Sequence, residues 1–373
     1  MNVLVTGSRA PASMDIMRSL ISQGNTVYSA DSMRFPLGRF VKGMRKHFTL
    51  PKPNRNPANF LQALKAILIA YQIDLLIPTC EEIFFISQGY EDLSKYTTLL
   101  CEPFERLNLL HNKYEFNQLV HEYGLDAPES WLLTTEEDKK KIPSGQPIVL
   151  KPVFSRFGSH VIMKPSQKSI NELPLNIPYL AQRFLMGKEY CAYAIAHEGE
   201  VLIQSCYHPK YLAGPAAGIY FEPVAIEAIT RFIKHFCMKY QFNGQIAFDF
   251  ILEEDKAFVL ECNPRTTSGF HLIAKDLSWP EILAGQQQQY QLPTRPFMLG
   301  LGMILHGLKY LRKNPKQFIV DYQNAHDVLK DRAYPWLSLK SMMTLSNILV
   351  RMVKEKKNFH NASTDDIEFN GKQ

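Results

Sequence analysis

The sequence lacks several features that would direct it to particular classes of protein. Its six cysteines lie far apart and form no C-x-x-C pair, which argues against a zinc site or a disulfide framework. No apolar run approaches the roughly 18 residues of a membrane span. The chain enters the apolar stretch NVLVTG at once, which leaves no room for a signal peptide. We therefore expect a cytoplasmic, soluble protein with reduced thiols.

A strong charge bias is also missing. The net charge of +6 is mild for 373 residues, and the lysine runs at 139–141 and 354–357 are typical of solvated faces. We therefore expect neither a nucleic-acid partner nor a membrane partner. The basic, amphipathic segment 338–357 leaves a membrane-surface role as an alternative, although we expect it to pack on the body of the protein or on a second subunit of a homodimer.

Residues 1–104 alternate short apolar runs with helical segments, a pattern that predicts a parallel, doubly wound, Rossmann-like domain. Its first turn, TGSRAPASM, contains only Gly7, whereas a dinucleotide fingerprint needs three glycines. Asp31 lies about where a ribose-binding acid would stand. Without the glycines, however, we do not expect NAD to bind there.

From residue 105 the pattern changes to helices followed by short strands, which indicates an α+β domain that is distinct from the first. We place this second domain at 105–290, and a mainly helical C-terminal extension at 291–373. The fold class expected is therefore α/β and α+β. A helix is expected at EPVAIEAITRFIKHFCMKY, residues 222–240, just before a hairpin.

The hairpin GQIAFDFILEEDKAFVLECN carries the clearest chemical signal. Glu261 and Asn263 share one face of the second strand, and we expect Leu260 and Cys262 to pack on the other. Asp249 on the first strand would stand beside them. Three oxygen ligands without Cys or His suit a hard cation such as Mg²⁺. The alternative is a solvated turn.

Two further stretches are ambiguous when each is read alone. Lys151 ends an apolar strand before the small-residue loop SRFGS, where backbone N–H groups could approach phosphate, or which could be an ordinary hairpin turn. The segment QRFLMGKE could present a strand end to a flat base, or could be a plain edge strand. Lys113 at a helix start would by default be a surface lysine.

The order of these elements resembles the ATP-grasp superfamily over about residues 105–275. A lysine at a helix start is followed by K-P after a strand, a small-residue loop, Q-R-F-L with G-x-E, D-F and finally E-x-N-P-R. The element E-x-N-P-R is the most specific, and the loop SRFGS departs from the family because it is poor in glycine. The N-terminal domain, with PTCEE at 78–82, looks like the domain that precedes ATP-grasp in biotin carboxylase-like and carbamoyl phosphate synthetase-like members.

The resemblance implies a set of ligands and roles. ATP and Mg²⁺ or Mn²⁺ would bind as cofactors, with a mobile lid at roughly 115–185. Arg265, together with Lys151, would be catalytic by stabilising charge on the transferred phosphoryl group. The implied ATP contacts are Lys113, Lys151, Ser155, Gly158, Ser159, Gln182, Arg183, Phe184, Leu185 and Glu189, and the implied metal ligands are Asp249, Glu261 and Asn263.

The implied reaction activates a small carboxylate, an amino acid among the candidates, as an acyl phosphate that an amine attacks, with release of ADP. For these small-molecule substrates we expect contacts from Glu81, with Glu82 as an alternative, and from Ser268 and His271. A satisfied structural histidine remains the alternative at His271. A noncatalytic ATP-binding protein of the same fold remains the alternative function.

Overall fold

The N-terminal sheet is parallel, as the sequence predicts. The computed structural model describes residues 1–155, 158, 160–214, 216–330, 337–356 and 359–371. Five strands run in the order β3-β2-β1-β4-β5 and every pair is parallel. The strands are β1 (Asn2–Val5), β2 (Thr26–Asp31), β3 (Lys46–Thr49), β4 (Leu75–Ile77) and β5 (Thr98–Leu99). The helical segments are α1 (Pro11–Ser22), η1 (Leu37–Phe40), α2 (Pro57–Ala70), α3 (Glu82–Gln88) and α4 (Tyr90–Leu93).

The single glycine of the first turn has a packing role. Gly7 adopts φ +62°, and a Cβ there would lie 2.6 Å from Oε1 of Glu82. A side chain would therefore collide with a buried carboxylate and also strain the backbone. The glycine lets the β1–α1 turn close on α3 of the same domain.

A second, seven-stranded sheet forms the centre of the molecule. Its order is β14-β13-β10-β11-β12-β15-β16. The strands are β10 (Lys188–His197), β11 (Glu200–Ala213), β12 (Ala217–Pro223), β13 (Gly244–Glu253), β14 (Lys256–Asn263), β15 (Phe297–Met298) and β16 (His326–Asp327). The helix expected at 222–240 begins only at residue 227, because Glu222 and Pro223 still pair with β11 as the end of β12.

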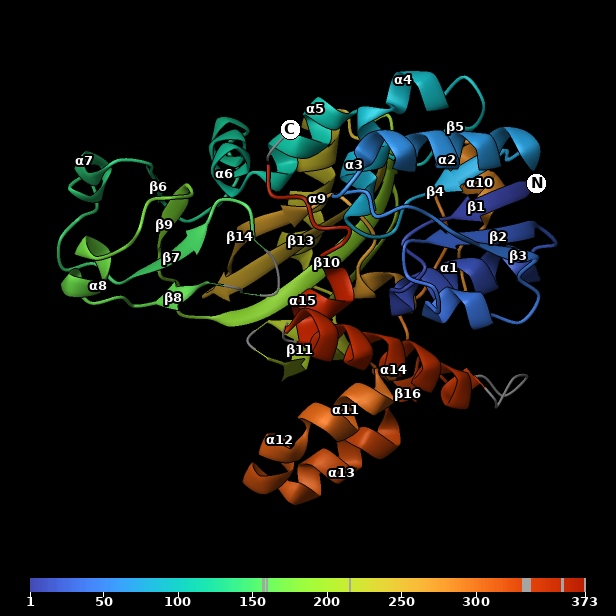
Figure 1. Cartoon of the computed structure of the whole chain (residues 1–373). Helices are drawn as coiled ribbons and strands as arrows, with labels where there is room; N and C mark the ends of the chain where they lie inside the picture. The colour runs from blue at the N-terminus through green and yellow to red at the C-terminus, as the bar shows by residue number, and fades with distance from the viewer. Residues whose placement is uncertain (156–157, 159, 215, 331–336, 357–358, 372–373) are drawn as a thin grey trace.

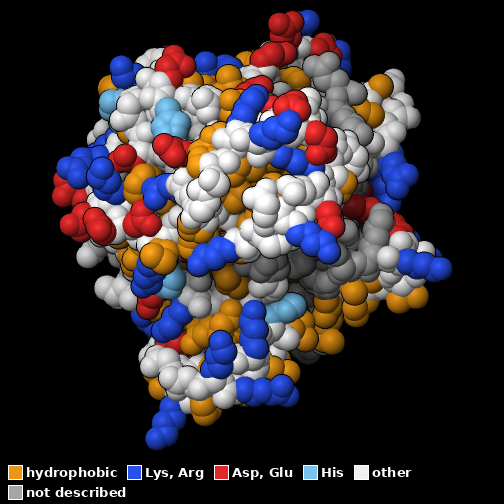
Figure 2. Space-filling view, turned by 90° about the vertical axis from the view of Figure 1, so that its left-hand side faces the viewer, with side chains coloured by type: hydrophobic (Ala, Val, Ile, Leu, Met, Phe, Trp, Pro, Cys, Tyr) orange, Lys and Arg blue, Asp and Glu red, His pale blue; other side chains and the backbone are white. Residues whose placement is uncertain are grey.

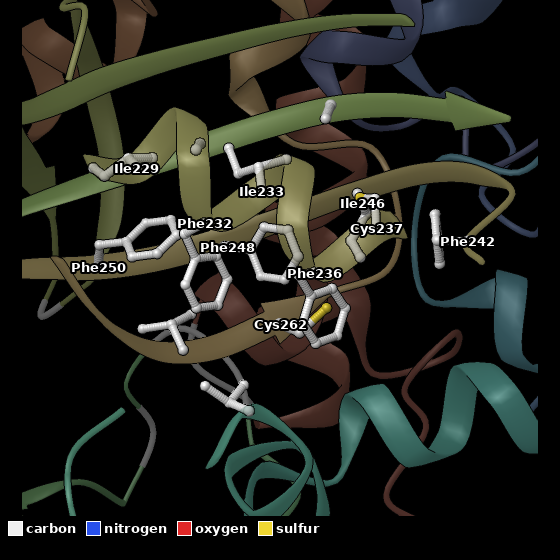
Figure 3. Close-up of a cluster of buried hydrophobic side chains, with 14 of the residues drawn as sticks. Ile229, Phe232, Ile233, Phe236, Cys237, Phe242, Ile246, Phe248, Phe250 and Cys262 are labelled. Carbon is white, nitrogen blue, oxygen red and sulfur yellow. The ribbon is translucent and has the colours of Figure 1, made fainter. Parts of the chain in front are cut away.

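Helices cover one face of this sheet and make its aromatic core. They are α5 (Phe104–His111), α6 (Lys113–Glu122) and α9 (Glu227–Tyr240). Phe232 and Phe236 of α9 meet Phe248 of β13 edge to face, with ring centroids 5.5 and 5.3 Å apart (Figure 3). Phe116 of α6 belongs to the same cluster. This packing holds the β13–β14 hairpin and the start of α6 in a fixed relation.

A third, four-stranded sheet projects to one side of the molecule (Figure 1). Its order is β6-β9-β7-β8, and it has its own small core. The elements are β6 (Ser130–Leu133), α7 (Glu136–Lys139), β7 (Ile148–Pro152), β8 (Ile162–Met163), α8 (Gln167–Asn171) and β9 (Tyr179–Arg183). The region 115–185, expected as the lid, contains this sheet, but its first residues lie in α6 and pack on the central core. Its mobility stays a prediction.

The C-terminal region is mainly helical and returns to the N-terminal domain. After η2 (Ser268–Leu272) come α10 (Trp279–Leu283), α11 (Gly300–His306), α12 (Leu308–Lys313), α13 (Pro315–Asn324), α14 (Leu337–Glu355) and α15 (Phe359–Thr364). In Figure 1, α11–α13 project below the body, while the chain end rises towards α5. Among the described helices, none combines the length and the apolar character that crossing a bilayer requires.

Candidate active site

The β13–β14 hairpin brings the three expected metal ligands together. Asp249 lies directly opposite Glu261 in the strand register, and Asn263 is opposite Ala247, two positions along. The Asn263 side-chain amide donates to Oδ2 of Asp249 at 3.5 Å. The three side chains therefore share one face of the sheet, as expected from the alternation of a strand.

An irregularity in β14 sets that face. The register shifts between Asp249 and Phe250, so that Phe250 pairs with Val259 while Asp249 pairs with Glu261, and Leu260 is the extra residue. Val259 and Cys262 are buried in the aromatic core, whereas Leu260 is half-buried. The expectation that Leu260 packs with Cys262 is therefore wrong, since the bulge makes Val259 the core partner.

Two lysines from different elements approach this face. Lys113 is the first residue of α6, whose N-cap Asn112 accepts hydrogen bonds from the backbone N–H groups of Tyr114 and Glu115. Its Nζ lies 3.2 Å from Oε2 of Glu261 and donates to the Ser155 carbonyl at 2.8 Å. Lys151, on β7 of the third sheet, donates to the Leu260 carbonyl at 3.1 Å. Neither is a surface lysine, because they are only 4% and 7% exposed.

The charges of this cluster perturb one another. Burial raises the pKa of Asp249, and the neighbouring Glu261 carboxylate raises it further. Burial also acts to raise the pKa of Glu261, but the ammonium groups of Lys113 and Lys151 outweigh it and lower that pKa. Burial lowers the pKa of Lys151 to about 8 despite the attraction of Glu261. Two carboxylates lie close together beside a side-chain amide, and a hard divalent cation bound there would reduce their mutual repulsion.

Residues expected around the adenine lie at the end of β9 and in the segment after it. Gln182 is buried and donates to Oγ of Ser130 at 3.2 Å; β9 lies between β6 and β7, so the edge-strand alternative is wrong. Arg183 pairs with Glu253 of the hairpin turn at 3.4 Å. Lys164 lies over the ring of Phe184, 4.2 Å from its centroid. Thus Arg183 and Phe184 are held by protein partners.

Two other expected contacts flank this segment. Leu185 is buried, and Glu189 pairs in register with Ile251 next to the acidic strand. Burial raises the pKa of Glu189, and Glu261 adds to the shift. Glu189 therefore lies within the electrostatic reach of Glu261, whereas its expected contact with ribose stays a prediction.

The small-residue loop follows β7 directly. Ser155 presents its carbonyl to Lys113, and Gly158 has φ +64°, a conformation that favours glycine. Ser159 lies outside the described residues. The first residue of the loop, Ser155, is thus bound to Lys113, one of the two buried lysines.

Arg265 joins the acidic face to the N-terminal domain. Its guanidinium donates to Oδ1 of Asn263 at 3.2 Å and lies 3.9 Å from Oε1 of Glu81. Glu82 turns inward instead, where its Oε1 accepts from the Thr6 hydroxyl at 2.8 Å. Burial raises the pKa of Glu82. Of the two acids expected near the substrate, only Glu81 therefore lies beside Arg265.

The segment after the hairpin is packed into the body. Ser268 is half-buried at the start of η2, and His271 is 2% exposed. Nδ1 of His271 shares a hydrogen bond of 2.8 Å with Oδ2 of Asp15 in α1, and its ring stacks on Phe221. These contacts support the alternative of a structural histidine that ties η2 to the first domain.

Residues 366–369 lie at the carboxyl edge of the N-terminal sheet, a placement that the sequence did not predict. Arg9 binds Asp31 and Asp366 with closest distances of 2.5 and 2.7 Å. Asp31, considered above as a ribose ligand, is therefore occupied by an arginine. Further along, the Phe369 N–H donates to Oε2 of Glu81 at 3.3 Å. The only local signal was Ile367 and Phe369, two apolar residues in an otherwise polar terminus.

Comparison with known proteins agrees with this geometry. Residues 110–269 match the model of the ATP-grasp domain family. The arginine-specific carbamoyl phosphate synthase large chain of Bacillus subtilis is 26% identical over 200 residues, which are 50% of this chain and 19% of that protein. This chain thus matches only about a fifth of the length of that curated relative.

Solved structures share the architecture over more of the chain. N5-carboxyaminoimidazole synthetase from Staphylococcus aureus has a TM-score of 0.63 at 14% identity, covering 84% of this chain and 86% of that one. An L-amino acid ligase from Bacillus licheniformis has a TM-score of 0.59 at 17% identity, covering 74% and 70%. At such identities the likeness concerns the fold. Together with the family match, it identifies residues 110–269 of this chain as an ATP-grasp domain.

Proposed function

We propose that the chain is an ATP-dependent ligase that activates a small carboxylate as an acyl phosphate for attack by an amine, with release of ADP and phosphate. The observation that carries the proposal is the convergence of two buried lysines on a paired carboxylate face. Lys113 and Lys151 come from a helix and from a separate sheet, yet both reach the strand that carries Glu261. Such an arrangement suits a polyphosphate and its cation.

The lysines would hold the phosphates of ATP. In the structure their charges are balanced by Glu261 and by backbone carbonyls of Ser155 and Leu260. A triphosphate would offer these ammonium groups stronger, charge-assisted partners. Asp249, Glu261 and Asn263 would then hold Mg²⁺, which supplies charge neutralisation for the phosphates. The lysine–carboxylate contacts would thus keep the cluster neutral until nucleotide and cation arrive together.

Arg265 would act at the Asn263 end of the acidic face. Its guanidinium is anchored by Asn263 and faces Glu81 of the N-terminal domain. A permanently charged fork in this position can bind the oxygens of a carboxylate or of the acyl phosphate formed from it. We place the carboxylate substrate beside Arg265, close enough to Glu81 that this acid could orient the attacking amine.

The proposal is tested by ADP and phosphate release from MgATP in the presence of pooled amino acids and small carboxylates. We expect release that depends on a pool and falls by about 10² or more in Glu261→Gln, the size of effect found when one electrostatic group is removed from a reacting centre. Glu227→Gln, a carboxylate that is 82% exposed on α9, is the matched control.

Binding measurements separate the alternatives. Calorimetric titration with MgATP should show binding to the wild type that weakens in Glu261→Gln. Tight binding without turnover in any pool would favour the noncatalytic ATP-binding alternative. A wild type that binds neither ATP nor Mg²⁺ would contradict the proposal.

A further inference from the structure

The C-terminal extension carries an apolar surface that is open to solvent. Ten large apolar side chains between residues 304 and 353 are 43% to 80% exposed. They lie on α11–α14 and are Ile304, Leu305, Leu308, Ile319, Val320, Met342, Met343, Leu349, Val350 and Val353. Exposed apolar residues scattered singly need no explanation, but a concentration on consecutive helices marks an interaction surface.

The geometry of α14 shows that this exposure is organised. Successive residues of a helix are about 100° apart, so Met342, Leu349 and Val353 fall within about 40°, with Met343 and Val350 bordering them. The opposite side packs on the body, where Ile348 meets Met33 of the N-terminal domain. A surface helix needs only one apolar stripe to dock. The second apolar stripe of α14, formed by Met342, Leu349 and Val353, is exposed and does not dock the helix on the described part of the protein.

The same region accounts for the net positive charge of the chain. Residues 300–357 contain eleven lysines and arginines against four acids, an excess of seven where the whole chain has +6. Exposed members are Lys309, Arg312, Lys313 and Lys316 on α12 and α13, and Lys340 and Lys354 on α14. Asp321, by contrast, is buried and faces inward to Lys210 at 2.8 Å. The outer face is therefore both apolar and cationic.

Figure 2 shows the two kinds of side chain together. Its lower part, at the height of α11–α13 in Figure 1, combines hydrophobic surface with several Lys or Arg side chains and few acidic ones. Above it, acidic and basic side chains are interspersed. The excess of basic side chains in this view therefore lies at the lower end.

We infer that the face formed by α11–α14, the C-terminal basic face, docks on the surface of an anionic lipid bilayer. Apolar side chains flanked by lysines match the boundary between acyl chains and anionic headgroups. A second copy of this chain is a poorer match, because a two-fold contact would place the two cationic faces against each other. The helices lie on the bilayer and do not cross it. This inference departs from the expectation of no membrane partner, and it rests on the exposed second stripe of α14.

The inference is independent of the proposed ligase activity and is tested by co-sedimentation of the full chain with vesicles. Vesicles of phosphatidylcholine with 30% phosphatidylserine are compared with phosphatidylcholine alone. We expect binding to the anionic vesicles that weakens as salt rises. Reversing two charges in Lys313→Glu/Lys316→Glu should weaken it about tenfold or more. Replacing the apolar stripe in Val350→Asp/Val353→Asp should weaken it as well.

A matched control carries the same chemical change elsewhere. Ile69→Asp/Met238→Asp alters two apolar side chains, each 51% exposed, on α2 and α9, and should leave vesicle binding unchanged. Equal binding to both vesicle types, or none to either, would overturn the inference. A dimer in analytical ultracentrifugation that Val350→Asp/Val353→Asp dissociates, with no vesicle binding, would assign the face to a second copy instead.

Discussion

Asp366 binds the C-terminal segment to the carboxyl edge of the N-terminal sheet, and its replacement by alanine tests how strongly. Its carboxylate accepts from Arg9 at 2.7 and 2.9 Å, from the Ser32 hydroxyl at 2.6 Å and from Arg351 at 3.1 Å. The Arg9 and Asp366 side chains are only 5% and 1% exposed. Removing one partner of a buried ion pair costs about 3–5 kcal/mol. Because Asp31 still neutralises Arg9, we expect the lower end, about 3 kcal/mol.

The assay is chemical unfolding of the full chain, compared with Asp276→Ala at an exposed acid for which we expect a change within about 0.5 kcal/mol. Asp366→Ala should shift the midpoint of unfolding to lower denaturant. An unfolding free energy within about 0.5 kcal/mol of the wild type would refute the reasoning. In that case the C-terminal segment would not be bound to the N-terminal sheet in solution.

The effect has a defined dependence on pH. Burial acts to raise the pKa of Asp366, but Arg9 outweighs it, and the hydrogen bond from Ser32 and the charge of Arg351 lower the pKa further. A carboxyl whose folded pKa is depressed stabilises the fold above its unfolded pKa of about 4 and loses that contribution as the pH falls through the folded value. The difference between wild type and Asp366→Ala should therefore be full at pH 7 and shrink below about pH 4. A difference that grows on acidification would contradict this assignment.

Two smaller changes test other parts of the structure. Burial raises the pKa of Glu82, so the wild type loses stability as the pH rises from the pKa of Glu82 in the unfolded chain to its higher pKa in the folded protein. Glu82→Gln should therefore have a higher melting temperature than the wild type at pH 8. At pH 4 the two melting temperatures should be similar. A lower melting temperature at pH 8 would show that the carboxylate itself is needed. Asn112→Ala removes the N-cap of α6, should cost about 1 kcal/mol and should weaken MgATP binding in calorimetry, because Lys113 begins that helix. Ser166→Ala, which uncaps α8, should affect stability but not binding, and equal binding losses in both would reject the link to Lys113.

The hairpin that carries the proposed metal ligands could be predicted because its signal is local. Alternation along a strand and a charged turn were enough to place Asp249, Glu261 and Asn263 on one face. The bulge at Leu260 could not be predicted in this way. It inserts a residue without changing the composition of the strand, so only the pairing with β13 reveals it.

The positions of the buried lysines depended on contacts between elements that are far apart in sequence. Lys113 meets Glu261 across 148 positions of the chain, and Lys151 meets Leu260 across 109. A family resemblance could name these residues, but the sequence alone could not distinguish them from surface lysines. The role of Arg9 could not be predicted from the sequence either. Arg9 lies in the first turn, which lacks the glycines of a dinucleotide fingerprint, and it pairs with Asp366 near the other end of the chain.

The C-terminal extension contacts residues of the candidate active site. On its inner side α14 places Arg351 against Asp366. Three residues after Asp366, the Phe369 N–H donates to Glu81. Glu81 in turn lies 3.9 Å from Arg265. On its outer side α14 presents the apolar stripe of the C-terminal basic face. One helix therefore contributes both to the contacts of Asp366 with the N-terminal domain and to the face that we assign to a bilayer. A bilayer bound to that outer stripe would leave the inner contacts in place, because the two sides of α14 use different residues.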